Sequence, residues 1–410
     1  MEHQVDSSPE VIRSRIASRF HRPLAWVVLF VAALQPAVAE AATLPPVVGP
    51  HERISAADRA SEIGYFGTCP ESPDGRTIAY VLYDGRPVAG GSKFSGGGLY
   101  LCDIDRKHHV KIRDIENIRW EDGAGVIWLD NDTLGYLAYE QDLPVTYIVD
   151  RSGRVLKGPI EAYIGHGDAP DGCIAMSVDK RQYPKGSSLG SNGIYLYKAG
   201  GITKIIDAER DLGGLKDRLD GSDDPREWNY FHAQLSPRGT LLSIRLDTEL
   251  GKQHLVTCRV DGTDVRLFGG PRKPLHQQWF DDSTIFGHEF AAKPADGGPR
   301  FRAKLWDRDG NILRVLAGVG NHPGISPDRK FIATDSQYET EPVIITLYRV
   351  GSTEPLAILM REPPGPVWRM RTHVNPAFSR DGRYVYFNKP VGGVPQAHRV
   401  FVGDLVRSAD

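Results

Sequence analysis

A short phrase, Ser-Pro-Asp-Gly or a close variant, recurs along most of the chain. Each copy precedes a segment of alternating apolar residues and then a second such segment that ends in a polar turn. The first unit has the phrase at Ser72–Gly75, followed by Thr77–Tyr83 and Leu99–Asp103. The period of about 40 to 50 residues indicates a propeller or a solenoid, because one unit of this size cannot bury its apolar face alone.

Seven such units follow one another. Their strands are short, alternate with period two and are joined by hairpin signals such as Asp261-Gly262, Asp309-Gly310 and Asp381-Gly382. The number of units and the strands within them predict an all-β fold, a seven-bladed β-propeller of four-stranded blades. Residues 42–60 are a candidate for a strand that closes the ring.

The N-terminal segment has the organisation of a secretory signal peptide. Four arginines between residues 13 and 22 precede an apolar run, Leu24–Leu34, and Ala37-Val38-Ala39 fits a small-x-small cleavage site. The apolar run is short for a membrane-spanning helix. We therefore expect residues 1–39 to be removed near Ala39, a periplasmic or secreted product, and no membrane attachment after cleavage.

Residues 40–410 are expected to form one propeller domain. Their largest departure from the repeat is at 203–229, a polar, glycine-rich insertion between the third and fourth blades. It is expected to carry a short helix around Ala208–Leu215 and to cap one face. Four cysteines are too few for a disulfide scaffold in 410 residues. The formal net charge of -2 argues against nucleic acid as a partner.

Histidines recur at one position of the repeat in the second half of the chain. His232, His276 and His322 each lie four residues before the turn of their unit. In the last unit Asn375 holds this position and His373 lies two residues earlier, on the same face of a strand. Because the innermost strand of a blade lines the channel, these side chains should meet at the channel or its rim. The pattern predicts a functional site; the alternative is a ring of structural polar residues around a wet channel.

Imidazole groups restrict the chemistry of such a site. Neutral histidine is a general base near physiological pH and a ligand for manganese, zinc or iron. No Asp or Glu shares the repeated position, which disfavours a hydrolase with paired carboxylates. Residues 186–190 fit the Gly-x-Ser-x-Gly pattern of esterases, but they lie in a polar loop without the strand-to-helix turn that the nucleophile needs.

The histidine phrases together resemble those of the oligogalacturonate lyases, seven-bladed propeller enzymes that cleave uronic-acid oligosaccharides by β-elimination. The resemblance covers residues 225–405 and is weaker elsewhere. It rests on His232 before a proline-containing turn, on His276-Gln-Gln-Trp279, and on the last phrase, His373-Val-Asn375-Pro-Ala-Phe378.

The resemblance implies that His232 is the base that takes the C5 proton of the uronate. It also implies manganese or another divalent metal that binds the uronate carboxylate, with His322 matching a further histidine of the pattern. The ligand positions of the family correspond to His276, His373, Asn375 and Met370. Asparagine ligates weakly and methionine is a poor ligand for a hard metal, so this set departs from the family's. Without the metal, Arg369, Arg371 or an arginine of the insertion would have to neutralise the carboxylate.

The sequence thus predicts a polysaccharide lyase whose partner is a uronate-containing oligosaccharide. The alternative is a non-catalytic propeller of the periplasmic TolB type that binds a protein or a glycan, because the Ser-Pro-Asp-Gly repeats are equally typical of that class. A third interpretation is the detached propeller of a peptidase.

Overall fold

The computed structural model describes residues 45–409, apart from 57–58, 86–93, 120–122, 216–223, 248–252, 269–273, 291–300, 317–319, 337–341 and 364–372. The expected signal peptide lies outside the described residues. No described helix is long and apolar enough to cross a membrane.

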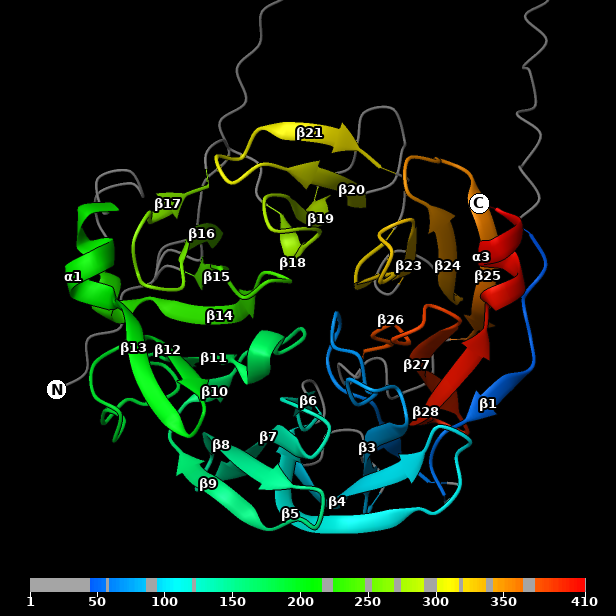
Figure 1. The fold of residues 1–410 in the computed structure, drawn as a ribbon, viewed down its shortest axis with the longest axis horizontal. Helices are drawn as coiled ribbons and strands as arrows, with labels where there is room; N and C mark the ends of the chain where they lie inside the picture. The colour runs from blue at the N-terminus through cyan, green and yellow to red at the C-terminus, as the bar shows by residue number, and fades with distance from the viewer. Residues whose placement is uncertain are drawn as a thin grey trace, which may run out of the picture. The chain divides into compact units, whose positions relative to one another are not determined.

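Seven four-stranded antiparallel sheets surround a central axis, which confirms the predicted seven-bladed propeller (Figure 1). Within a blade the first strand lies nearest the axis and the last at the rim, as β18 and β21 show in Figure 1. The first blade consists of β2 (Ser61–Glu62), β3 (Thr77–Tyr83), β4 (Phe94–Asp103) and β5 (Val110–Arg119). The second consists of β6 (Ile127–Trp128), β7 (Thr133–Glu140), β8 (Leu143–Asp150) and β9 (Val155–Ile160). The third consists of β10 (Tyr163–Ile164), β11 (Ile174–Val178), β12 (Gly193–Lys198) and β13 (Gly201–Asp207).

The histidine-bearing phrases belong to the other four blades. The fourth blade consists of β14 (Asn229–Leu235), β15 (Leu241–Asp247), β16 (Gln253–Arg259) and β17 (Arg266–Leu267), and the fifth of β18 (Leu275–Trp279), β19 (Ile285–Phe290), β20 (Phe301–Trp306) and β21 (Ile312–Val315). The sixth consists of β22 (Pro323–Ile325), β23 (Phe331–Asp335), β24 (Val343–Arg349) and β25 (Pro355–Glu362). The seventh consists of β26 (Ala377–Phe378), β27 (Tyr384–Val391), β28 (Val394–Phe401) and β1 (His51–Arg53).

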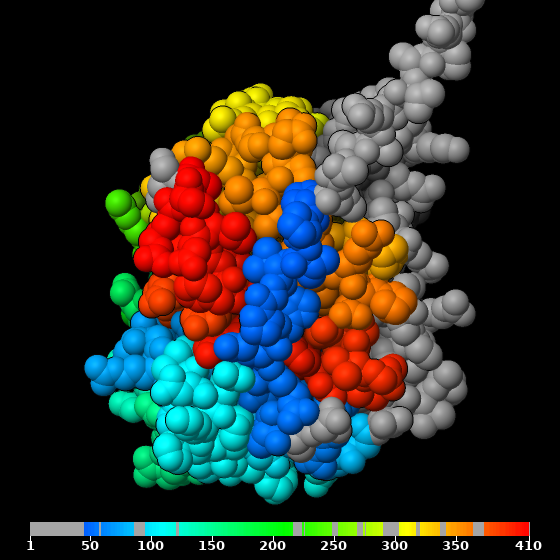
Figure 2. All heavy atoms as spheres, turned by 90° about the vertical axis from the view of Figure 1, so that its right-hand side faces the viewer, coloured from blue at the N-terminus to red at the C-terminus, as the bar shows by residue number. Residues whose placement is uncertain are grey.

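The seventh blade takes its outermost strand from the N-terminal part of the chain. β1 pairs with β28 in antiparallel register, and Glu52, opposite Arg399, also accepts a hydrogen bond from its guanidinium at 2.8 Å. Figure 2 shows this N-terminal segment running across the side of the ring between C-terminal segments. The expectation that residues 42–60 supply a closing strand is confirmed.

The region between the third and fourth blades differs from the expected insertion. Residues 203–207 belong to β13, so the departure from the repeat begins only at α1 (Ala208–Leu212). The Asp207 carboxylate caps α1 by accepting hydrogen bonds from the Glu209 and Arg210 N–H groups. Viewed along the axis, α1 lies at the rim, not over the channel (Figure 1). Two short 3-10 helices are η1 (Pro170–Gly172), in the turn of the third blade, and η3 (Pro225–Glu227), which contacts α1. The helix α3 (Gly403–Ser408) follows β28.

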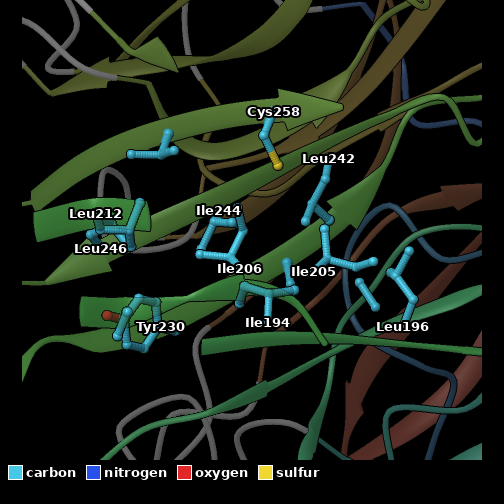
Figure 3. Packing of buried hydrophobic residues seen from close by; sticks show 14 of the residues in the cluster. Ile194, Leu196, Ile205, Ile206, Leu212, Tyr230, Leu242, Ile244, Leu246 and Cys258 are labelled. Carbon is cyan, nitrogen blue, oxygen red and sulfur yellow. The ribbon is translucent and has the colours of Figure 1, made fainter. Parts of the chain in front are cut away.

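The core lies between neighbouring blades. Alternate residues of β12 and β15, such as Ile194, Leu242 and Ile244, interdigitate between the third and fourth blades, and Leu212 of α1 extends this cluster (Figure 3). Cys258 is buried in the same cluster. All four cysteines are buried and none forms a disulfide.

The recurring phrase is a hydrogen-bonded turn that joins the first and second strands of a blade. In the first blade Ser72 Oγ donates to the Asp74 carboxylate at 2.6 Å and accepts from the Thr77 N–H at 3.1 Å. The Gly75 N–H donates to the Ser72 carbonyl, and Gly75 has a φ of 68°. This left-handed conformation explains why the phrase ends in glycine.

Candidate functional site

The inner strands of the fourth to seventh blades bring the predicted histidines into contact. His232 lies on β14 and His276 on β18, whereas His322 and His373 precede β22 and β26. The ring centroids of His276 and His322 are 4.5 Å apart, and those of His322 and His373 are 4.3 Å apart. His232 is 5.9 Å from His276 by the same measure. The four imidazoles therefore form one cluster, which we call the histidine cluster.

Backbone conformation aims these side chains at the channel. His232, His276 and Asn375 hold the same position in three blades, and all three have left-handed φ values, of 50°, 47° and 49°. The ladders of β14 and β18 change register next to His232 and His276, as at a β-bulge. Such bulges re-aim side chains and recur beside functional sites. Histidine and asparagine tolerate this conformation better than most residues with a Cβ atom.

An aromatic pair from the first blade fills the centre of the histidine cluster. The Phe66 ring is fully buried and lies 4.9 Å from the ring of His276 and 5.5 Å from that of His232. The Tyr65 ring lies 5.7 Å from His232 and 6.2 Å from His373. An apolar ring at this point lowers the polarity around the imidazoles.

Two further histidines join the cluster without having been predicted. The His166 ring lies 4.8 Å from that of His232, and the His288 ring lies 5.1 Å from that of His276. His166 precedes the turn of the third blade by three residues instead of four, so a search for histidines four residues before a turn does not find it. His288 lies on β19, the second strand of its blade, where the pattern has no position.

Burial lowers the pKa of four of these imidazoles, those of His232, His276, His166 and His288. Desolvation lowers the pKa of His232 and of His276 well below 6.5, and neighbouring cationic or titrating side chains act in the same direction. The same cause lowers the pKa of His166 and of His288 to about 3. His232 and His276 nevertheless keep partial solvent exposure, whereas His322 and His373 are 0% and 6% exposed. His232 and His276 are therefore neutral imidazoles that are not fully enclosed.

Hydrogen bonds hold two of the rings in place. His322 Nδ1 bonds the Asp335 carboxylate at 2.9 Å, with both side chains fully buried. His276 Nδ1 donates to the Asn321 carbonyl at 2.9 Å, which leaves its Nε2 as the nitrogen with a free electron pair. His232 Nδ1 and Asn375 Oδ1 are buried without a hydrogen-bond partner among the described residues.

The donor set has the chemistry of a divalent metal site, although the side chains that the structure describes do not surround a metal position. Neutral imidazoles and an amide oxygen suit a divalent transition metal. Within the described residues, no group of three or more His, Cys, Asp or Glu side chains surrounds a common metal position. Met370, at the remaining ligand position, and Arg369 and Arg371 lie outside the described residues.

The fold and the cluster together define a seven-bladed propeller with a histidine-lined channel. Its fold is similar to that of an oligogalacturonate lyase in complex with manganese, with a TM-score of 0.57, 16% identity, and coverage of 87% of this chain and 94% of that one. It is also similar to the oligogalacturonate lyase of Vibrio parahaemolyticus, with a TM-score of 0.60, 14% identity, and coverage of 87% and 96%. TolB from Acinetobacter baumannii gives a TM-score of 0.39 at 13% identity, over 69% and 65%. No family model and no curated protein matches this sequence. The likeness to the two lyases shows a shared fold over most of the chain, beyond residues 225–405 where the phrases resemble that family.

Proposed function

We propose that this protein is a lyase that cleaves uronic-acid oligosaccharides by β-elimination. The observation that carries the proposal is the convergence of His232, His276, His322 and His373 from four different blades on one end of the channel. We propose further that the protein acts in the periplasm or outside the cell, after removal of residues 1–39.

The reaction needs a base and a neutralised carboxylate. The C5 proton of a uronate is weakly acidic, because the carbanion that forms lies beside a carboxylate that is already negative. When the base takes this proton, the C5–H electrons form the C4–C5 double bond, the C4–O bond breaks, and the departing sugar oxygen takes up a proton. Positive charge beside the carboxylate lowers the barrier of the first step.

His232 is the residue best suited to be the base. Its low pKa keeps it neutral, the residue as a whole is only partly buried, and its buried Nδ1 has no partner among the described residues. Gln277 Nε2 donates to the His232 carbonyl at 3.0 Å and holds the left-handed backbone that aims the ring. His276, His373 and Asn375, with His322 beside them, would hold a divalent metal such as manganese. A bound metal would supply the positive charge that the uronate carboxylate requires.

The experiment follows the ultraviolet absorbance of the unsaturated product that the elimination leaves. The purified full-length chain is incubated with uronic-acid oligosaccharides, with and without added Mn²⁺. We expect product from the native chain and a loss of about 10²-fold or more for His232→Ala, the size of a typical general-base contribution. His108→Ala is the matched control, since the His108 side chain is 79% exposed on the first blade and should be dispensable.

A contrary result points to a different function. If no uronic-acid glycan gives an unsaturated product under any metal condition, the lyase proposal is wrong. A propeller that binds a protein or a glycan without cleaving it then becomes the better hypothesis. Asn375, which replaces the histidine of the lyase phrase, agrees with that alternative. Metal analysis of the same preparation tests the divalent ion independently of activity.

A further inference from the structure

A cavity of about 340 Å³ lies at the turn end of the channel. Its rim carries the proline that follows the first residue of the turn in four blades, namely Pro73, Pro170, Pro237 and Pro327. Gln234 and Gln278 also line it, each two residues beyond a histidine on an inner strand, whereas no histidine does. This turn-end cavity is therefore distinct from the histidine cluster. Its volume lies at the lower end of the range for small-molecule sites, about 300 to 1,000 Å³.

Arg329, which lines the turn-end cavity, occupies a position that the fold reserves for glycine. It ends the phrase Ser326-Pro-Asp-Arg329, and its φ of 63° matches the 68° of Gly75 and the 72° of Gly382 in the equivalent turns. Its N–H makes the same bond, to the Ser326 carbonyl. A left-handed residue with a Cβ atom is strained, so glycine would suit this turn better. The chain instead places an arginine in the cavity wall.

The charge of Arg329 is not balanced by a partner. No hydrogen bond or ion pair joins its guanidinium to another residue that the structure describes. Four carboxylates act on it electrostatically, and each is already engaged. Asp168 pairs with Arg380, Asp281 and Asp328 accept hydrogen bonds within their own turns, and Asp282 accepts from the Arg238 N–H. Desolvation lowers the pKa of Arg329, although arginine stays protonated at physiological pH.

The second cation of the cavity, Arg380, is neutralised. Its guanidinium pairs with the Asp168 carboxylate at 2.8 Å and donates to the Glu71 carbonyl. Glu71 itself is bound to the Arg380 N–H and to Tyr386. Of the charged side chains that line the cavity, Arg329, Arg380 and Asp168, one positive charge remains uncompensated.

We propose that the turn-end cavity binds a small carboxylate through Arg329. A guanidinium presents two parallel N–H donors that match a carboxylate. Asp168 faces the same cavity and repels additional negative charge, which favours a singly charged ligand over a phosphate dianion. The walls contributed by Leu235, Ile325 and Phe378 suit a ligand with a small apolar body.

Calorimetric titration of the full-length protein with benzoate, at constant ionic strength, tests this site. We expect saturable binding that weakens at least tenfold in Arg329→Gly. That variant should keep or raise the melting temperature, because glycine is the residue that the turn prefers. Arg76→Ala removes an equal charge from an 84% exposed side chain beside the first-blade turn, and should bind benzoate like the native protein.

Two further titrations separate this proposal from its rivals. Inorganic phosphate should bind at least tenfold more weakly than benzoate; tighter phosphate binding would overturn the assignment to a carboxylate. His232→Ala should retain benzoate binding, because the turn-end cavity does not depend on the proposed lyase site. Absence of saturable benzoate binding, or equal binding by the native protein and Arg329→Gly, would refute the proposal whatever the lyase assay shows.

Discussion

Within the histidine cluster, the His322 ring is held by a hydrogen bond to one buried carboxylate, that of Asp335. Its Nδ1 meets Asp335 at 2.9 Å where neither side chain is exposed, so Asp335→Ala leaves a buried imidazole N–H unsatisfied. We expect the free energy of unfolding to fall by about 1–3 kcal/mol, measured by urea denaturation. Asp335→Asn keeps an acceptor and should recover much of the loss.

A second His–Asp pair supplies the contrast. His108 and Asp103 lie 2.5 Å apart but are 79% and 52% exposed, so solvent screens their interaction. Asp103→Ala should leave the denaturation curve unchanged. An equal loss at both sites would mean that burial does not govern the strength of the His322 pair.

The sequence predicted where the site lies, but not which other side chains surround the histidines. A common offset from the turn was enough to predict that His232, His276 and His322 meet, because equivalent positions of a repeat project to one place. It could not show that Phe66 fills the space between them, since the first blade carries no histidine at that offset. The bond of His322 to Asp335 was also hidden, because it depends on side-chain directions that the spacing does not determine.

At the level of the strand, the left-handed residues in β14 and β18 lead to a test of backbone strain. His276→Asn should be tolerated, whereas His276→Val should be less stable than His276→Asn by about 1–2 kcal/mol, because a β-branched residue fits the left-handed region poorly. Chemical denaturation of both variants measures the difference.

His398, on the regular strand β28, is the matched control. Its side chain is 7% exposed, and extended backbone favours valine over asparagine. The order of the two substitutions should therefore reverse at this position. The same order at both positions would show that backbone conformation does not set the preference at His276.

The sequence predicted the strands best where one face of a strand is buried and the other is not, and where the turn phrase before the strand is intact. β13 was missed in part: residues 203–207 were assigned to an insertion. As the outermost strand of its blade, β13 is half exposed, so Thr203 and Lys204 resemble the polar segment that follows. An outer strand has only one covered edge, and its composition therefore carries less of the alternation on which the prediction relied.

For the whole molecule, buried neutral histidines predict acid sensitivity. The pKa values of His166 and His288 are lowered to about 3 and that of His398 to about 4, chiefly by burial. Below pH 6.5 the unfolded chain therefore binds more protons than the folded one. The stabilisation is complete above pH 6.5 and is lost as the pH falls towards these values, by roughly 2 kcal/mol for each histidine at pH 5.

One buried carboxylate works in the opposite direction. Burial raises the pKa of Asp179 to about 6, so its protonation in the folded state offsets about 1 kcal/mol of that loss between pH 7 and 5. Denaturation curves at pH 7, 6 and 5 should still show a falling free energy of unfolding. His398→Gln removes one titrating group and should flatten the profile; a profile without any acidic decline would contradict the assignment of neutral histidines.

The pairing of β1 with β28 has a consequence for the order in which the ring is completed. Six blades are built from contiguous sequence, but the seventh joins His51 to Val400 and must await the last strand of the chain. Val48 packs on the same cluster as Leu405 and Ala409, so the described ends lie close together. A circular permutant that begins at Ser61, and carries residues 45–60 after residue 409 through a short linker, would form every blade from contiguous sequence. It would complete the same ring without the longest-range pairing, with the histidine cluster and the turn-end cavity unchanged.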